Sequence, residues 1–204
     1  ETAKKRELKK AGESPPKRGN RKREGEKSSS FFYQRRNMKF YNIADEYINF
    51  LRTFDSKVSE NKQESRPYIG VVIEIEEMKY YAPFTSPKAK HRKMKNGKDF
   101  RKIQGGEYGA INFNNMIPVP DCALKLIDID NESDQKYRRL LQNQYRAIRA
   151  DSEEIIKTAA RLRKLVMTGD ENLTTFDKRI KERCCNLKII EQVYTQFNMK
   201  QTNR

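Results

Sequence analysis

The sequence predicts an α+β fold, in which a small antiparallel sheet is followed by a group of helices. Three observations lead to this prediction. Hydrophobic residues alternate with a period of two over residues 69–75, and a tight connection leads from there to a second strand-like segment, residues 79–84. After Asn131 they recur at helical spacing over most of the remaining chain. Aromatic residues make up 10% of the chain, which permits a core even though 35% of all residues are charged.

The chain is strongly basic. Its 204 residues suggest one domain with an appendage, and its net charge is +16. A charge of this size is typical of proteins that bind polyanions, meaning nucleic acid or an anionic membrane surface. A surface that is charged only for solubility is the simpler alternative.

About half of that charge lies in residues 1–37, which contain 13 Lys/Arg and five Glu. Residues 1–30 are poor in apolar side chains and include Pro15-Pro16 and three consecutive serines. Such a segment buries too little surface to offset its ordering entropy, so we expect it to be disordered. We interpret residues 1–37 as a basic extension of a domain over residues 38–204. We prefer the explanation that they are not native and that Met38 is the true start, and a native disordered extension is the alternative.

The sequence gives no sign of a membrane segment or a disulfide framework. No apolar run approaches the ~20 residues that a spanning helix needs, and the pattern of a signal peptide is absent. The three cysteines, Cys122 and the adjacent Cys184 and Cys185, have the spacing of neither a disulfide framework nor a metal site. We therefore expect a cytoplasmic protein.

The first predicted elements are a strand and a helix. Phe40-Tyr41 is typical of a short strand. Apolar residues then recur at helical spacing over residues 43–55, and Asn42 is available as the helix cap. The two alternating segments that follow a polar loop predict an antiparallel hairpin, which ends at Thr85-Ser86.

Two further strands and three helices complete the prediction. The strands are expected over residues 110–117 and 123–129, with Pro118 and Pro120 between them at the sheet edge. The first helix follows Asn131. Asp151 and Glu154 resemble a capping box for the second, and Gly169 fits as its stop. The last helix is predicted over residues 174–197.

The most informative stretch is the end of the hairpin. Thr85 and Ser86 precede Pro87, which restricts the backbone, and Lys88 opens a basic segment. Residues 88–102 contain eight Lys/Arg and one acid, Asp99. Hydroxyls on a rigid turn beside a cluster of cations suit a site that handles phosphate, and the cations suit an RNA groove. An ordinary turn followed by a solvated face is the simpler alternative.

These residue types suit phosphodiester cleavage of RNA. The attacking group is the 2′-hydroxyl of the RNA itself, so the protein needs only to align it and to stabilise the crowded phosphorane. We assign Ser86 to positioning of the 2′-hydroxyl, with Thr85 beside it. Lys88 is assigned to charge stabilisation, together with Arg66, which the hairpin would bring alongside.

Other chemistries have less support. Asp128 and Asp130 have no further ligand near them in sequence, so a solvated strand exit is preferred to a metal site. A serine triad needs an imidazole base and an orienting carboxylate, and the one histidine, His91, lies in the basic segment. We prefer an RNA contact or an exposed position for His91 to a general acid. No metal and no cofactor is predicted.

Four segments resemble the ToxN/AbiQ family of toxin endoribonucleases from type III toxin–antitoxin systems, some of which act in phage abortive infection. They are residues 38–41 (Met-Lys-Phe-Tyr), 66–70 (Arg-Pro-Tyr-Ile-Gly), 81–88 (Tyr-Ala-Pro-Phe-Thr-Ser-Pro-Lys) and 109–118 (Gly-Ala-Ile-Asn-Phe-Asn-Asn-Met-Ile-Pro). The third segment is a specific signature of the family, whereas each of the others is modest evidence by itself. The resemblance runs from Met38 to near the C-terminus, and residues 1–37 fall outside it.

The resemblance implies a compact antiparallel sheet similar to the Kid/MazF toxin barrel and packed with several helices. It also implies metal-independent cleavage of single-stranded cellular or phage RNA, which leaves a 2′,3′-cyclic phosphate and a 5′-hydroxyl. A repeated pseudoknot RNA antitoxin would inhibit the toxin within a ring of several protein and RNA copies.

Particular residues fall on positions of the family. Thr85, Ser86 and Lys88 match its active-site block, and Arg66 stands where other members carry lysine. Arginine keeps the charge but cannot donate a proton at neutral pH, so only charge stabilisation is expected of Arg66. The expected RNA contacts are Tyr47, Lys90, His91, Arg92, Lys93 and Lys95.

A second hypothesis stays open: a non-catalytic module that binds RNA or DNA with the same basic groove. The block Thr85-Ser86-Pro87-Lys88 favours the enzyme, because binding alone does not require it.

Overall fold

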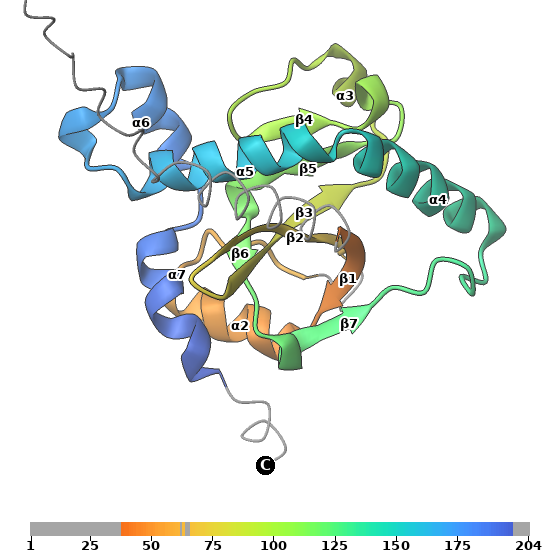
Figure 1. Cartoon of the computed structure of the whole chain (residues 1–204), viewed down its shortest axis with the longest axis horizontal. Helices are drawn as coiled ribbons and strands as arrows, with labels where there is room; N and C mark the ends of the chain where they lie inside the picture. The colour runs from red at the N-terminus through yellow and green to blue at the C-terminus, as the bar shows by residue number, and fades with distance from the viewer. Residues whose placement is uncertain (1–37, 62, 64–65, 198–204) are drawn as a thin grey trace, which may run out of the picture. The chain divides into compact units, whose positions relative to one another are not determined.

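The computed structural model describes residues 38–61, 63 and 66–197, which form an α+β domain as predicted (Figure 1). The predicted basic extension, residues 1–37, lies outside the described residues. No helix among those that are described is long and apolar enough to cross a bilayer.

Seven strands of the described chain form one sheet. Its spatial order is β4-β5-β3-β2-β1-β7, with β6 also paired to β3, and the paired strands are antiparallel. The strands are β1 Lys39–Ile43, β2 Tyr68–Ile75, β3 Met78–Thr85, β4 Phe100–Lys102, β5 Ala110–Asn112, β6 Ile117–Pro118 and β7 Leu124–Leu126. The predicted hairpin is confirmed, whereas β4 was missed because three residues are too few to show an alternating pattern.

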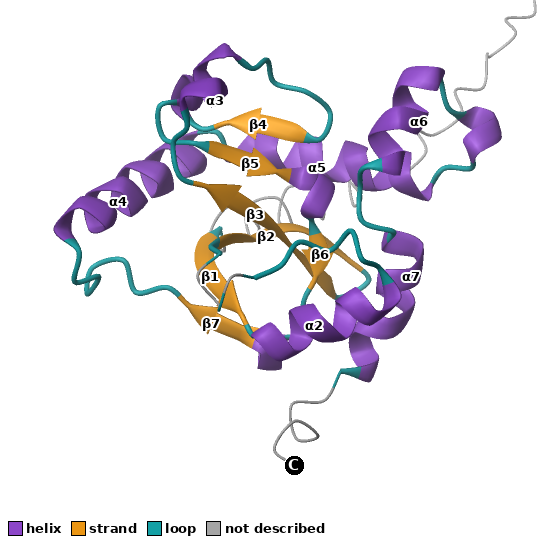
Figure 2. Cartoon of the chain, turned by 180° about the vertical axis from the view of Figure 1, so that it is seen from behind, coloured by secondary structure: helices purple, strands orange, loops and turns teal. Residues whose placement is uncertain are grey.

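The helices surround this sheet (Figure 2). In the described chain they are α2 Asp45–Phe54, α3 Ala89–Lys93, α4 Gln135–Ala150, α5 Ser152–Met167, α6 Thr175–Glu182 and α7 Leu187–Val193. The predicted Asn42 cap is wrong, since α2 begins after Ala44 and has no side-chain cap. The α4 helix does have one, because the Asp134 carboxylate accepts from the backbone N–H groups of Lys136 and Tyr137.

The hairpin of β2 and β3 contains two local irregularities. Its turn is formed by Glu76 and Glu77, which both have positive φ (49° and 68°), as a tight hairpin turn requires. Its register shifts between Gly70 and Ile73, so the strict alternation inferred for this strand is broken by a bulge. Gly70 lies beneath the ring of Tyr81, where an added Cβ would be 2.0 Å from the ring.

The strand predicted over residues 110–117 is in fact two short strands on the same edge of β3. Between β5 and β6 the backbone forms a 3₁₀ turn, Phe113–Asn115. The N–H groups of Phe113 and Asn114 there donate to the carbonyl of Asp99 instead of to β3. Pro118 belongs to β6, where it pairs with Tyr80, and does not lie between strands as expected.

The last predicted helix is also divided. Between α6 and α7 the backbone is bound by distant partners: the N–H of Cys185 donates to the carbonyl of Asn114, and the N–H of Asn186 donates to the carboxylate of Asp55. These bonds replace helical ones and turn the chain. Residues 183–186 therefore fasten the C-terminal helices to the sheet side of the domain.

Two expectations about α5 are wrong. Asp151 precedes the helix but makes no capping bond, because its carboxylate accepts hydrogen bonds from the guanidinium of Arg101 in β4. Gly169 is not a left-handed stop, since its φ is −64°. The helix ends at Met167, and the N–H and hydroxyl of Thr168 complete its last turn by donating to the Lys164 carbonyl.

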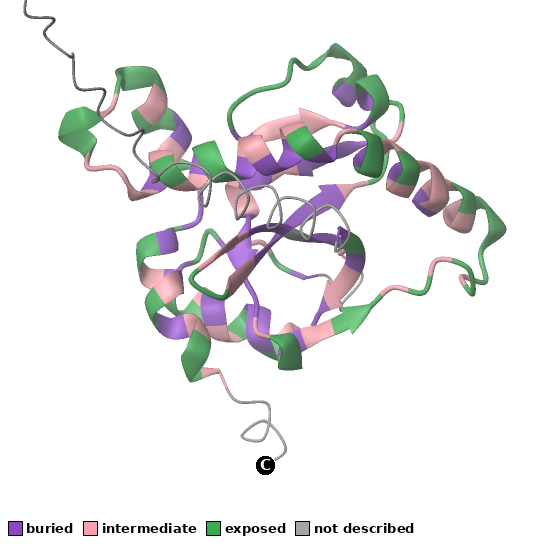
Figure 3. Cartoon of the chain, viewed as in Figure 1, coloured by how far each residue is buried: buried purple, intermediate pink, exposed green. Residues whose placement is uncertain are grey.

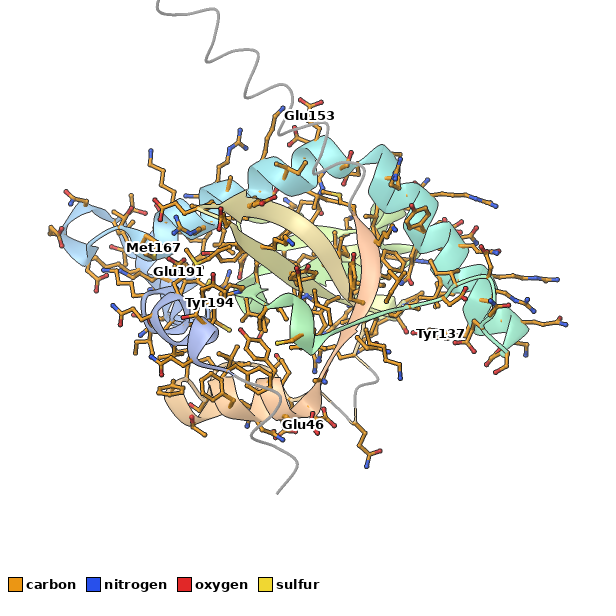
Figure 4. All side chains as sticks on the ribbon, turned by 60° about the horizontal axis from the view of Figure 1, so that its bottom comes forward. Glu46, Tyr137, Glu153, Met167, Glu191 and Tyr194 are labelled. Atoms are coloured by element: carbon orange, nitrogen blue, oxygen red, sulfur yellow. The ribbon has the colours of Figure 1, made fainter. Side chains whose placement is uncertain are left out.

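The core lies between the sheet and the helices that cover it, and buried residues concentrate there (Figure 3). A polar cluster crosses this region. The guanidinium of Arg163 in α5 donates to the carboxylate of Glu191 in α7, and the Tyr80 hydroxyl of β3 donates to the same carboxylate. Figure 4 shows Glu191 near Met167, at the C-terminal end of α5. The cluster joins two helices to the central strand.

The C-terminal end of β3 is held closely by the loop that precedes β5. Gly109 has a φ of 98°, and a Cβ added to it would lie 1.9 Å from the carbonyl oxygen of Thr85. Only glycine combines this backbone conformation with so close an approach. Nearby Gly105 also has a positive φ (63°) but has no atom within 4 Å of an added Cβ.

These two glycines give a matched test. We expect Gly109→Ala to lower the free energy of unfolding by on the order of 3 kcal/mol, because backbone strain and overlap with the strand both apply. Gly105→Ala carries the strain alone and should cost about 1 kcal/mol. Urea unfolding of both variants measures the difference. Equal losses would show that the close approach to Thr85 is not a constraint.

Candidate active site

The predicted hydroxyl turn stands at the edge of the folded domain. Thr85 ends β3 and pairs with Ala110 of β5, while Ser86 and Pro87 form an exposed link. Lys88 is exposed and precedes α3, and its carbonyl accepts from the N–H of His91. One strand end therefore carries the two hydroxyls, and the first residue of the basic segment follows directly.

The hydroxyl of Thr85 is in an unusual state. Its Oγ1 is buried and has no hydrogen-bond partner among the described residues. A buried hydroxyl without a partner is costly, and it commonly marks a place where another group binds. The Thr85 hydroxyl is therefore inaccessible to solvent, whereas its neighbour Ser86 is exposed.

Arg66 lies beside this turn, as the hairpin prediction required. Tyr68 of β2 pairs with Pro83 of β3, and the N–H of Phe84 donates to the carbonyl of Pro67, so the same register places Arg66 opposite Thr85. The Nε of Arg66 donates to the Glu60 carbonyl at 3.0 Å. This bond uses one of the five guanidinium N–H groups, and no other bond of this guanidinium to a described residue occupies the rest.

A residue that sequence reasoning missed fixes the turn from the opposite side. Gln144 of α4 is 1% exposed, and its amide Nε2 donates to the carbonyls of Tyr108 (2.7 Å) and Thr85 (3.4 Å). It thereby joins a helix, the loop before β5 and the strand end. A signal was present: Gln144 stands on the buried face between Leu141 and Ile148, where a polar residue needs partners.

The basic segment divides into bonded and free cations. Lys98 and Arg101 form salt bridges with Asp177 and Asp151, and Arg183 neutralises Asp99. The remaining predicted contacts are exposed and form no salt bridge with any described residue; they are Lys90, Arg92, Lys93 and Lys95. The structure therefore leaves a cationic surface on α3 and the loop after it, adjacent to Ser86.

Two residues that were expected to contact RNA are buried. Tyr47 is fully buried, and its hydroxyl donates to the carbonyl of Pro118 at 2.6 Å. His91 is 3% exposed, and its backbone lies so close to Gly106 that a Cβ there would be 2.7 Å away. In this structure both are core residues. The sequence pattern alone did not distinguish them from exposed side chains of the same segments.

A basic surface that the prediction overlooked lies on α4. This helix carries five Lys/Arg and no acidic residue among its 16 residues. The guanidinium of Arg149 stacks on Tyr145 at 5.7 Å from the ring centroid, and Tyr145 contacts Phe40 edge-on. The side chain next to Tyr145 is Gln144, which binds Thr85. The basic helix therefore leads to the hydroxyl turn.

The two aspartates considered for a metal site are a strand exit, as preferred. Asp128 and Asp130 are exposed beyond β7, and the Asp128 carboxylate accepts from the backbone and amide N–H groups of Asn131. These bonds lower the pKa of Asp128. The described part of the chain contains no group of three or more His, Cys, Asp and Glu side chains suited to a metal ion.

The environment of His91 makes a prediction about pH. Burial lowers the pKa of the imidazole below its usual value, and the charges of Lys88 and Lys90 lower it further. Below about pH 6.5 the unfolded chain therefore binds a proton that the folded chain does not, so the free energy of unfolding should fall as the solution is acidified.

We expect this dependence to be shallower in His91→Gln, which cannot titrate, because His91 is the one histidine of the chain. Urea unfolding of the parent and the variant at pH 7.5 and pH 5.5 makes the comparison. The same pH dependence in both proteins would contradict a neutral, buried His91.

Comparison with known proteins identifies the family of this chain. A family model described as toxin ToxN of type III toxin–antitoxin systems matches residues 39–195. Endoribonuclease ToxN of Pectobacterium atrosepticum is 35% identical over 170 residues, which is 78% of this chain and 94% of that protein. Endoribonuclease AbiQ of Lactococcus lactis subsp. lactis is 31% identical over 189 residues, which is 85% and 98% of the two proteins.

Solved structures share the fold. One comes from work on bacterial type III systems with selective toxin inhibition by a non-coding RNA pseudoknot; it has a TM-score of 0.69 at 30% identity and covers 82% of this chain and 99% of that one. The structure of AbiQ, described as a lactococcal anti-phage endoribonuclease, has a TM-score of 0.65 at 22% identity and shows the fold alone. Because the family match spans most of the chain, this protein belongs to the ToxN family of toxins from type III toxin–antitoxin systems.

Proposed function

We propose that this protein is an endoribonuclease toxin that cleaves single-stranded cellular or phage RNA at the turn that ends β3. The observation that carries the proposal is the placement of Ser86, exposed beside the free cation Lys88 and next to Thr85, with Arg66 across the hairpin. The endoribonuclease names of the relatives support the same activity.

The proposed reaction needs only RNA, protein and solvent water. The 2′-oxygen attacks the adjacent phosphorus and releases its proton to water, while the bond from phosphorus to the 5′-oxygen breaks and that oxygen takes a proton from water. The products are a 2′,3′-cyclic phosphate and a 5′-hydroxyl. Ser86 positions the 2′-hydroxyl, Thr85 orients the phosphate, and Lys88 and Arg66 stabilise the charge of the phosphorane.

We propose that RNA reaches this turn along two basic surfaces. One is the free cationic surface of Lys90, Arg92, Lys93 and Lys95, and the other is α4. An RNA pseudoknot antitoxin would occupy these surfaces and thereby inhibit the toxin; selective toxin inhibition by a non-coding RNA pseudoknot is described for the related structure. From the family resemblance we also propose a closed assembly of several toxin and RNA copies, and a toxin domain that begins at Met38. The family match from residue 39 supports that boundary.

Replacement of one hydroxyl tests the catalytic assignment. Ser86→Ala should lower the cleavage rate by on the order of 10²–10³, because one preorganised donor is lost, and should relieve growth arrest in a bacterial host. Ser56→Ala is the control, since Ser56 is an exposed serine in the loop after α2. Gel analysis of a labelled RNA gives the rates, and circular dichroism checks the folding of both variants.

Toxicity that persists in Ser86→Ala at equal protein levels would refute the role of this hydroxyl. A parent protein that binds RNA tightly but cleaves none would instead favour the alternative, a non-catalytic module that binds RNA or DNA with the basic groove.

Metal independence has its own test. The turn, residues 85–88, supplies hydroxyls and a cation but no carboxylate, which is the usual protein ligand of Mg²⁺, so we expect cleavage to continue in excess EDTA. Mass spectrometry of the products should show the cyclic phosphate. Activity that disappears with the chelator and returns with Mg²⁺ would contradict the proposal and direct attention to Asp128 and Asp130.

A further inference from the structure

The second half of the basic segment, residues 88–102, borders a further hollow of the molecule. At Gly97 and Lys98 the loop after α3 borders a cavity of about 610 Å³. Its other walls are the C-terminal half of α5 and the start of α6 (Figure 1). No residue of the candidate active site lines this cavity. The basic segment thus begins beside Ser86 and extends along the chain to a separate cavity.

The walls of the cavity carry unpaired positive charge. Arg161 and Lys164 are exposed, stand three residues apart on one face of α5, and form no salt bridge within the described part of the chain. The lining contains one carboxylate, Asp177, which is bound by Lys98 and by the Thr174 hydroxyl. The cavity therefore has two cations left for an anion.

Its surroundings also offer apolar and aromatic surface. Leu165 and Leu173 line the cavity. Phe176 at the start of α6 is 61% exposed, and the Nζ of Lys98 lies 5.8 Å from the centre of its ring. An exposed aromatic ring beside cations is the arrangement on which an unstacked nucleic-acid base packs while its phosphate is bound nearby.

We propose that this α5–α6 cavity is a second RNA subsite, which binds one or two nucleotides of a single strand whose path continues from the active site along the basic segment. Arg161 and Lys164 bind the phosphate, and Phe176 with the two leucines receives the base. The proposal rests on the proposed function for the identity of the partner. It assigns to that RNA a contact outside the cleavage site.

Binding of labelled RNA tests the subsite without interference from cleavage. The background is Ser86→Ala in the full chain, and the probe is a 20-nucleotide single-stranded RNA. Into this background are placed either Arg161→Ala with Lys164→Ala or the control pair Lys125→Ala with Arg179→Ala, which are exposed cations outside the cavity. Both pairs remove the same charge. Fluorescence anisotropy over a range of salt concentrations gives the slope of log affinity against log salt.

The cavity pair should reduce the steepness of this slope by roughly 0.7, because Arg161 and Lys164 bind one phosphate and each phosphate contact on a single strand contributes about 0.7. The control pair should leave it near the parent value. A third variant, Phe176→Ala, should weaken binding without changing the slope, since it removes stacking and no charge. Photocrosslinking of an RNA that contains 4-thiouridine should label the segment with Phe176.

The outcomes separate the two proposals. If the background protein binds the RNA but the cavity and control pairs give equal slopes, the subsite is refuted and the proposed function stands. If it binds no RNA at any salt concentration, both fail. Competition by a polyglutamate peptide that is as effective as RNA and equally sensitive to the cavity pair would also overturn the proposal, because it would show a surface for any polyanion.

Discussion

The structure depends on how the C-terminal end of β3 is held. This strand pairs with β2 on one side and with both β5 and β6 on the other. At its last residue, Thr85, the carbonyl oxygen accepts from Gln144 and lies against Gly109, where no side chain fits. Strand, loop and helix therefore fix the backbone of one residue. The position of Ser86 follows, because only one peptide bond separates it from this fixed point.

The cations of this protein fall into two groups that the net charge does not distinguish: those paired with carboxylates and those without such a partner among the described residues. Carboxylates are directed to particular cations: Asp151 to Arg101, Asp99 to Arg183, and Asp177 to Lys98. These pairs join the basic segment to α5 and α6 and so carry a structural role. The cations without carboxylate partners remain on the outside of α3, α4 and α5, where their mutual repulsion is relieved when a polyanion binds.

Much of the fold could be predicted because its periodic segments are long. The hairpin of β2 and β3 and the helices α4 and α5 have clear patterns, and the bulge between Gly70 and Ile73 is a local exception. The two breaks in predicted elements share one cause. The breaks at Phe113–Asn115 and at residues 183–186 arise where backbone N–H groups donate to distant acceptors, and no local pattern records such partners.

The candidate site shows the same limit. Thr85, Ser86 and Lys88 could be proposed because they are adjacent in sequence, and Arg66 because the hairpin register brings it near. For Gln144 the sequence could show a polar residue on a buried helix face, but it could not identify the partners, since the contact with Thr85 spans 59 residues. Tyr47 and His91 were expected to contact RNA because of the family resemblance, whereas their burial depends on the segments that pack over them.

The long-range contact of Gln144 has a consequence for synthesis of the chain. A ribosome adds roughly 5–20 residues per second, so the 59 residues from Thr85 to Gln144 take on the order of 3–12 s. Until α4 has left the exit tunnel, the hairpin can form but the backbone at Thr85 lacks its amide donor. During this period the nascent chain already contains residues 85–88, but the backbone of Thr85 is not yet held by Gln144. The turn at Ser86 therefore acquires its full support only after α4 has been synthesised.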